Sequence, residues 1–163
     1  MKRNSHLSIA LLLLSGSLVL TLAQDAEMAL YTRITTATEK NEPDWKLARR
    51  ALLPDQLVMR WDSNKDRLIV AVSILPSVAK AKEVLKSEVD QMENRPSPTP
   101  PKTELKDFGD ECYMLKSNDG AGAHILFRQG IYYVHVGAPT EEVARRFVRD
   151  VSNSLQTTNN RSD

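Results

Sequence analysis

Two histidines in the segment HILFRQGIYYVHV, residues 124–136, have a spacing that could place them together. The segment alternates on both sides of Gln129-Gly130, a pattern that predicts a β-hairpin with a two-residue turn. Counting outward from that turn places His124 directly opposite His135. Because imidazole nitrogen is a common metal ligand, this arrangement raises the question of a metal site.

A structural or catalytic zinc site normally takes at least three protein ligands. Pairing the preceding segment ECYML with the first hairpin strand places Glu111 near Arg128 and Leu115 near His124. Neither neighbour completes a coordination shell, so we expect no cofactor and interpret the histidines as residues that line a surface or groove. The alternative is a metal-binding protein or metal-dependent hydrolase that uses His124 and His135.

The two faces of the predicted hairpin differ in character. One face carries Phe127, Tyr132 and Val134 and is apolar enough to be the core face. The other face carries the candidate binding residues, which are His124, His135, Tyr133 and Arg128. We expect this second face to bind a partner, either a protein or a small molecule.

Cys112 is the only cysteine, so no internal disulfide can form. It alternates with Met114 on the predicted core face, and unpaired cysteine often behaves as a small buried hydrophobe. Asp110 and Glu111 precede it and would oppose a thiolate. We therefore expect Cys112 to be buried and inert.

Other segments resemble known functional motifs but lack the residues that those motifs require at fixed positions. DSNKD at residues 62–66 resembles the start of a calcium loop, but Arg67 and Ser73 stand where that loop needs glycine and glutamate, so a hairpin turn is favoured. GAG at residues 120–122 is followed by a strand pattern and not by a helix N-terminus. No Gly-x-Ser-x-Gly elbow is present. The sequence thus favours a binding or accessory module over an enzyme.

The N-terminus has the pattern of a secretory signal peptide, residues 1–23. A short basic start precedes a leucine-rich stretch, and Thr21-Leu22-Ala23 offers small residues at the cleavage positions. The apolar stretch is shorter than the about 20 residues that span a membrane, and acidic residues follow it. We expect a secreted or periplasmic protein without a membrane anchor.

Cleavage after residue 23 of 163 would leave 140 residues, which suits one domain. Removing Lys2 and Arg3 from the 22 basic residues leaves 20, against 21 acidic residues. These charges are interspersed without a basic stripe, so nucleic acid is not an expected partner.

The remaining chain predicts a single α+β domain at residues 43–156. Residues 24–42 are poorly patterned, and AEMAL and LYTRITTAT leave helix and strand both open. Residues 44–53, which contain Trp45, predict a short amphipathic helix. Strands are expected near 56–61, 67–75, 111–116, 123–128 and 131–137, with longer helices at 77–92 and 140–155. A proline-rich connector occupies 93–103, and 157–163 form a frayed tail.

These elements predict a mainly antiparallel sheet of about five strands packed with two long helices. The apolar face with Phe127 is the natural partner of both, and the short helix would cover the other face. Sliding the sequence by 63 positions puts Pro76 on Pro139 and strand 68–75 on 131–138, which suggests a duplicated strand-strand-helix unit. The aligned faces differ in apolar character, so a spurious repeat remains an alternative.

Overall fold

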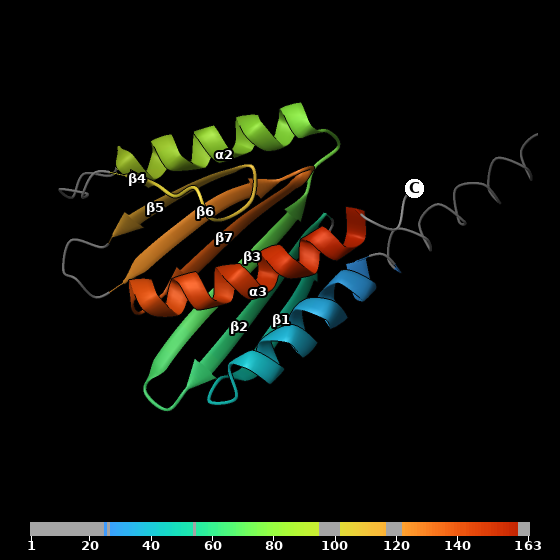
Figure 1. Cartoon of the computed structure of the whole chain (residues 1–163), viewed down its shortest axis with the longest axis vertical. Coiled ribbons are helices and arrows are strands. Elements are labelled where there is room, and N and C mark those ends of the chain that lie inside the picture. The colour runs from blue at the N-terminus through green and yellow to red at the C-terminus, as the bar shows by residue number, and fades with distance from the viewer. Residues whose placement is uncertain (1–24, 26, 54, 95–101, 117–121, 160–163) are drawn as a thin grey trace, which may run out of the picture.

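A computed structural model describes residues 25, 27–53, 55–94, 102–116 and 122–159. Their core is a seven-stranded sheet in the order β1-β2-β3-β7-β6-β5-β4, antiparallel throughout, with three helices packed on it (Figure 1). The expected α+β class is therefore confirmed, with two more strands and one more long helix than predicted.

The strands are β1 (Lys46–Leu53), β2 (Gln56–Ser63), β3 (Asp66–Ile74), β4 (Thr103–Glu104), β5 (Glu111–Lys116), β6 (Ala123–Gln129) and β7 (Tyr132–Ala138). The helices are an N-terminal helix at residues 27–41, α2 (Val78–Glu93) and α3 (Glu141–Asn159). The five expected strands correspond to β2, β3, β5, β6 and β7. The two additional strands, β1 and β4, form the sheet edges.

The helix predicted at residues 44–53 is wrong, because this segment is the edge strand β1. Its sequence KLARRALL consists mainly of good helix formers, yet it pairs with β2 from Lys46 opposite Asp62 to Leu53 opposite Gln56. Pairing with a strand that is already part of the sheet outweighs the weak intrinsic preference of the segment.

The N-terminal segment that sequence patterning left undecided is a helix. Leu30, Ile34 and Thr38 follow one another at intervals of four residues and are all buried. This spacing forms one narrow stripe, which packs with Trp45 and the β2 residues of the main core. Four threonines among its residues mask the helical pattern, since threonine favours strands.

The helices form layers on both sides of the sheet. The N-terminal helix and α3 cover the face that carries Phe127 and Val134, and they lie side by side in Figure 1. The helix α2 packs on the opposite face, against Leu126 and Tyr133. The expectation that both long helices share the Phe127 face is therefore wrong for α2. It fails because β6 carries a fully buried apolar residue on each face, Phe127 on one and Leu126 on the other, so either face could receive a helix.

The structure does not show the proposed duplication at an offset of 63 residues. At that offset Ile69 and Ala71 align with Tyr132 and Val134. Ile69 pairs with Gly137 and Ala71 with His135, so both lie on the α2 side of the sheet, whereas Val134 lies on the α3 side. The helices that follow the two strand pairs also cover opposite faces.

Local signals at helix starts and turns are confirmed. The Ser77 hydroxyl caps α2 by accepting a hydrogen bond from the Lys80 amide at 3.1 Å. Thr140 accepts one from the Val143 amide at 3.2 Å at the start of α3. The DSNKD segment forms the β2–β3 turn, where Asn64 has a φ of 34°.

Several sequence predictions fall partly or wholly on residues outside the described ranges. These are the signal peptide at 1–23, most of the proline-rich connector and the last four residues of the predicted tail. The connector is shorter than predicted at its described ends, because α2 includes Glu93 and β4 begins at Thr103. Likewise α3 continues to Asn159. Among the described helices, none has the length and apolar character needed to cross a membrane.

Candidate functional site

The hairpin that carries the histidines has a different register from the predicted one. Gln129 pairs with Tyr132, so Gly130 and Ile131 form the turn in place of Gln129-Gly130. Gly130 has a φ of +58°, a conformation that glycine adopts without strain. The register is shifted by two residues, which keeps every side chain on its predicted face.

His124 and His135 are diagonal neighbours and do not pair directly, which corrects the predicted arrangement. His124 stands opposite Gly137, and His135 stands opposite Leu126. The two rings nevertheless meet, with His124 Nδ1 2.9 Å from His135 Nε2. A Cβ atom on Gly137 would lie 3.3 Å from His124 Nδ1, so the missing side chain leaves room for this ring. The predicted juxtaposition is therefore present with a different geometry.

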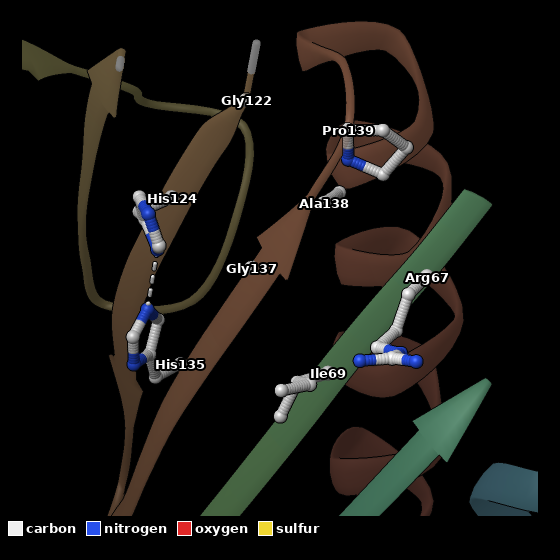
Figure 2. Close-up of a pocket in the computed structure, with 8 residues that line it drawn as sticks. All are labelled: Arg67, Ile69, Gly122, His124, His135, Gly137, Ala138 and Pro139. Carbon is white, nitrogen blue, oxygen red and sulfur yellow. Dashed lines mark hydrogen bonds between the residues drawn. The ribbon is translucent and has the colours of Figure 1, made fainter. Parts of the chain in front are cut away.

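The two imidazole rings are arranged end to end (Figure 2). Their centroids lie 5.2 Å apart and the facing nitrogens 2.9 Å apart, a difference about equal to the two ring radii together. The nitrogens therefore point almost directly at each other. This is the geometry of an N–H···N hydrogen bond, in which one ring donates and the other accepts.

This geometry differs from that of two ligands on one metal ion. Two nitrogens that bind the same metal ion both direct their lone pairs at the ion and not at each other. In the part of the chain that the structure describes, no group of three His, Cys, Asp or Glu side chains is close enough to hold a metal. The donor set therefore favours a hydrogen-bonded pair over a metal site.

The histidine pair lines one side of an open hollow of about 370 Å³ (Figure 2). Arg67 lies on the other side, and Ile69 and Gly137 lie between them. The other lining residues are Gly122, Ala138 and Pro139. The hollow thus combines two ionisable sides with an apolar floor, contributed by β3, β6 and β7 and by the residues that flank these strands.

The hollow is open because α2 covers only part of its face of the sheet. This helix contacts β6 and β7 and packs near Leu126 and Tyr133, away from β1 and β2. We call the uncovered part the helix-free face. It includes Lys46, Arg49, Val58, Arg60, Asp62, Arg67, Ile69, Ala71, His124, His135 and Gly137, which strand pairing places on one side. Ile69 is 46% exposed although β3 is an inner strand.

The helix-free face is basic. Lys46, Arg49, Arg60 and Arg67 lie on it with one carboxylate, Asp62. Arg60 makes a 3.1 Å ion pair with this carboxylate, whereas the Arg67 Nε atom is 3.8 Å from it. The Arg67 side chain is 66% exposed. The charge near the hollow is therefore positive.

The structure places the other two predicted binding residues elsewhere. Tyr133 is buried beneath α2, and both this burial and the Glu88 carboxylate raise the pKa of its hydroxyl. Arg128 is 8% exposed and pairs with Asp110 at 2.6 Å and Glu111 at 3.4 Å. Neither residue lines the hollow. Arg128 instead pairs with Asp110, just before β5, and donates to the Gly130 carbonyl in the β6–β7 turn.

Cys112 is buried in the main core, as predicted. Burial raises the pKa of its thiol to about 12, and Arg145 opposes this shift while Asp107 adds to it. The predicted pairing of its strand is also confirmed, with Glu111 opposite Arg128 and Leu115 opposite His124.

A second hollow of about 250 Å³ lies beside α3. Its lining is mainly polar and consists of Asp107, Phe108, Arg145, Arg149, Ser152, Asn153 and Gln156. Arg145 is engaged by Glu141 at 2.9 Å, and the Ser152 hydroxyl donates to Gln129 at 2.8 Å. Its two arginines and one carboxylate offset each other in part, and no histidine lines it.

Comparison of the chain with protein-family models, curated proteins and solved structures gives no match.

Sequence reasoning found only the two histidines of the hollow and missed its other lining residues, among them Arg67, Ile69 and Gly137. Gly137 had a usable signal, because an isolated glycine in a strand often marks a close approach of another group. Ile69 belongs to the less apolar face of its strand, and the sequence does not show that this face lies beside the histidines. That neighbourhood results from the β3–β7 pairing.

Proposed function

We propose that this protein is an exported, non-catalytic binding or accessory module that binds its partner on the helix-free face. The observation that carries the proposal is the open hollow between the histidine pair and Arg67, with exposed Ile69 on its floor. An exposed isoleucine beside a cationic group and two imidazoles offers both apolar contact and directional polar contact. Ligand sites commonly have this combination.

The composition of the lining supports binding over catalysis. Among the described residues that line the hollow, no serine, cysteine or carboxylate accompanies the histidine pair. The facing nitrogens hydrogen-bond to each other and so do not activate a nucleophile on the described strands. Cys112, the only cysteine, lies in the core and its thiol has a raised pKa, so it is a poor candidate for a catalytic nucleophile.

The proposal can be tested by NMR with the 15N-labelled protein and a library of small acids, amines and neutral compounds. We expect binders to shift amide resonances of β3, β6 and β7 around Ile69, His124 and Gly137. Replacing Ile69 with Ser should weaken binding, since it removes apolar contact from the floor at an exposed position.

A matched control is Arg149→Gln, which changes the second hollow only. It should leave these shifts unchanged. Compounds that shift resonances around Arg149 and none around Ile69 would contradict the proposal, as would the absence of any binder at the helix-free face.

A further inference from the structure

We infer that the hollow beside the histidine pair binds a small molecule with a carboxylate group and a compact apolar body. This inference rests on the proposed function and specifies the ligand of the same site. It follows from three features of the hollow, which are its charge, its floor and its size.

The charge favours an anion. Arg67 contributes a largely exposed guanidinium group, and Lys46, Arg49 and Arg60 lie on the same face with only Asp62 to offset them. At 3.8 Å the Arg67–Asp62 contact is longer than a charge-assisted hydrogen bond. A planar carboxylate matches the guanidinium fork and can accept two N–H bonds from it.

The histidine pair is compatible with this charge. The N–H···N bond between the rings persists when both are neutral and when one ring is protonated, but two protonated rings would place two N–H groups against each other. The pair therefore carries either no charge or one positive charge while the contact lasts. Both states accept an anion, and the second repels a cation.

The floor favours an apolar body. Ile69, Ala138 and Pro139 contribute carbon atoms, and Gly137 leaves the strand between them flat. Figure 2 shows Ile69 between Arg67 and the histidines, so a ligand that reaches a charged side must cover it. Covering this side chain removes apolar surface from water, which favours binding.

The size favours a small ligand. A volume of about 370 Å³ lies near the lower end of the range of small-molecule sites, about 300–1,000 Å³. One aromatic ring with a short acidic chain would fit this space. A long acidic polymer is disfavoured, because Asp62 lies among the basic residues that such a polymer would cross.

The test uses three compounds: 3-phenylpropionate, its neutral amide and propionate. Each is titrated into the 15N-labelled protein at low salt, and the amides of the hollow report the affinity. We expect the acid to bind about two- to fivefold more tightly than the amide, the range that one exposed ion pair supplies. Propionate should bind more weakly than the phenyl acid because it lacks the apolar body.

Two variants and one control assign the preference to particular residues. Arg67→Gln should lower the affinity for the acid to that for the amide, whereas Arg149→Gln, in the second hollow beside α3, should keep the preference. Ile69→Ser should weaken the binding of the acid and of the amide by a similar factor.

The outcomes separate this inference from the proposed function. If the amide, or the amine 3-phenylpropylamine, binds in the hollow as tightly as the acid, the carboxylate assignment is wrong while the binding module stands. If an acidic peptide binds and the small acids do not, the assignment to a small molecule is wrong. If Arg67→Gln leaves the preference for the acid intact, the assigned contact is wrong.

Discussion

At the scale of single residues, Gly137 leaves room for the contact between the two histidines. A Cβ atom there would lie 3.3 Å from His124 Nδ1 and 3.4 Å from its Cε1 atom, a spacing that requires the ring to move. We predict that Gly137→Ala disrupts the 2.9 Å contact with His135. Because the φ angle of Gly137 is not positive, the free energy of unfolding should change by less than about 1 kcal/mol.

The ring contact can be followed through the 15N chemical shifts of the imidazole nitrogens. Gly130→Ala provides the matched control, because it places a Cβ atom in open space at a φ of +58°. That variant should cost about 1 kcal/mol in stability and leave the histidine shifts unchanged. If the histidine shifts respond to Gly130→Ala and not to Gly137→Ala, our account of the contact is wrong.

Replacing both His124 and His135 with Gln tests the alternative of a structural metal site. The pair contributes one hydrogen bond between half-buried side chains, worth about 1 kcal/mol or less. We therefore expect a nearly unchanged melting temperature, measured with and without a chelator. A large loss of stability in the variant, matched by a loss on adding chelator to the wild type, would show that the histidines hold a metal.

Cys112 should be inert in the folded protein. Its burial excludes reagents, and a thiol with a pKa of about 12 is scarcely ionised at pH 7–8. We predict that an aromatic disulfide reagent modifies it slowly under native conditions and rapidly in denaturant. Rapid modification without denaturant would show that the core around β5 opens readily.

At the scale of elements, a hydrogen bond and an ion pair connect the end of the N-terminal helix to α3. Asn41 donates to Asp150 at 2.6 Å, and Arg146 pairs with Glu42 at 3.0 Å. Asp150 is 5% exposed, and its second carboxylate oxygen has no hydrogen-bond partner. Burial raises the pKa of Asp150, although the Asn41 hydrogen bond and Arg149 oppose this shift.

The raised pKa has a defined consequence for stability. The folded carboxyl binds a proton more readily than the unfolded one, so its ionisation destabilises the fold as the pH rises above about 4. We predict that Asp150→Asn, which can still accept from Asn41, stabilises the protein more at pH 7 than at pH 4. Urea unfolding of the wild type and the variant at the two pH values measures this difference.

The control is Glu39→Gln, an exposed position on the same N-terminal helix. It should show no such dependence on pH. An equal effect of Asp150→Asn at both pH values would mean that the ionisation of Asp150 does not oppose folding.

The sequence predicted the buried face of each strand more accurately than the register between paired strands. The β5–β6 register is correct, because the apolar alternation of ECYML must match that of β6. The β6–β7 register is off by two residues. Gln129-Gly130 and Gly130-Ile131 are both two-residue turns, and the alternation is the same for both, so the pattern cannot distinguish them. The pair of histidines was thus found, but its geometry was not.

At the scale of the whole molecule, one sheet separates two cores. The larger core lies between the sheet, the N-terminal helix and α3, and the smaller core lies beneath α2. The sequence could not assign α2 to its face, since β6 offers Phe127 on one side and Leu126 on the other, both fully buried. The helix-free face, and with it the hollow, results from this assignment.

The two cores share the strands β5, β6 and β7, which makes a single cooperative domain the expected behaviour. Phe127→Ala should cost about 3 to 5 kcal/mol and Leu126→Ala about 2 to 5 kcal/mol, because each leaves a cavity in a different core. We predict that urea unfolds both variants in one transition, seen alike by tryptophan fluorescence and by circular dichroism. Trp45 and Trp61 report only the larger core, where they contact Phe147 edge to face at 5.4 and 5.8 Å.

The m-value provides the decisive comparison, since it scales with the surface that unfolding exposes. One domain predicts the same m-value for the wild type and both variants, with only the midpoints lowered. If Leu126→Ala instead produced an early loss of helix signal while the tryptophan signal stayed native, α2 and its core would unfold as a separate unit. The helix-free face would then extend over β5 and β6 whenever α2 detached, and the histidine hollow would not be a fixed feature of the fold.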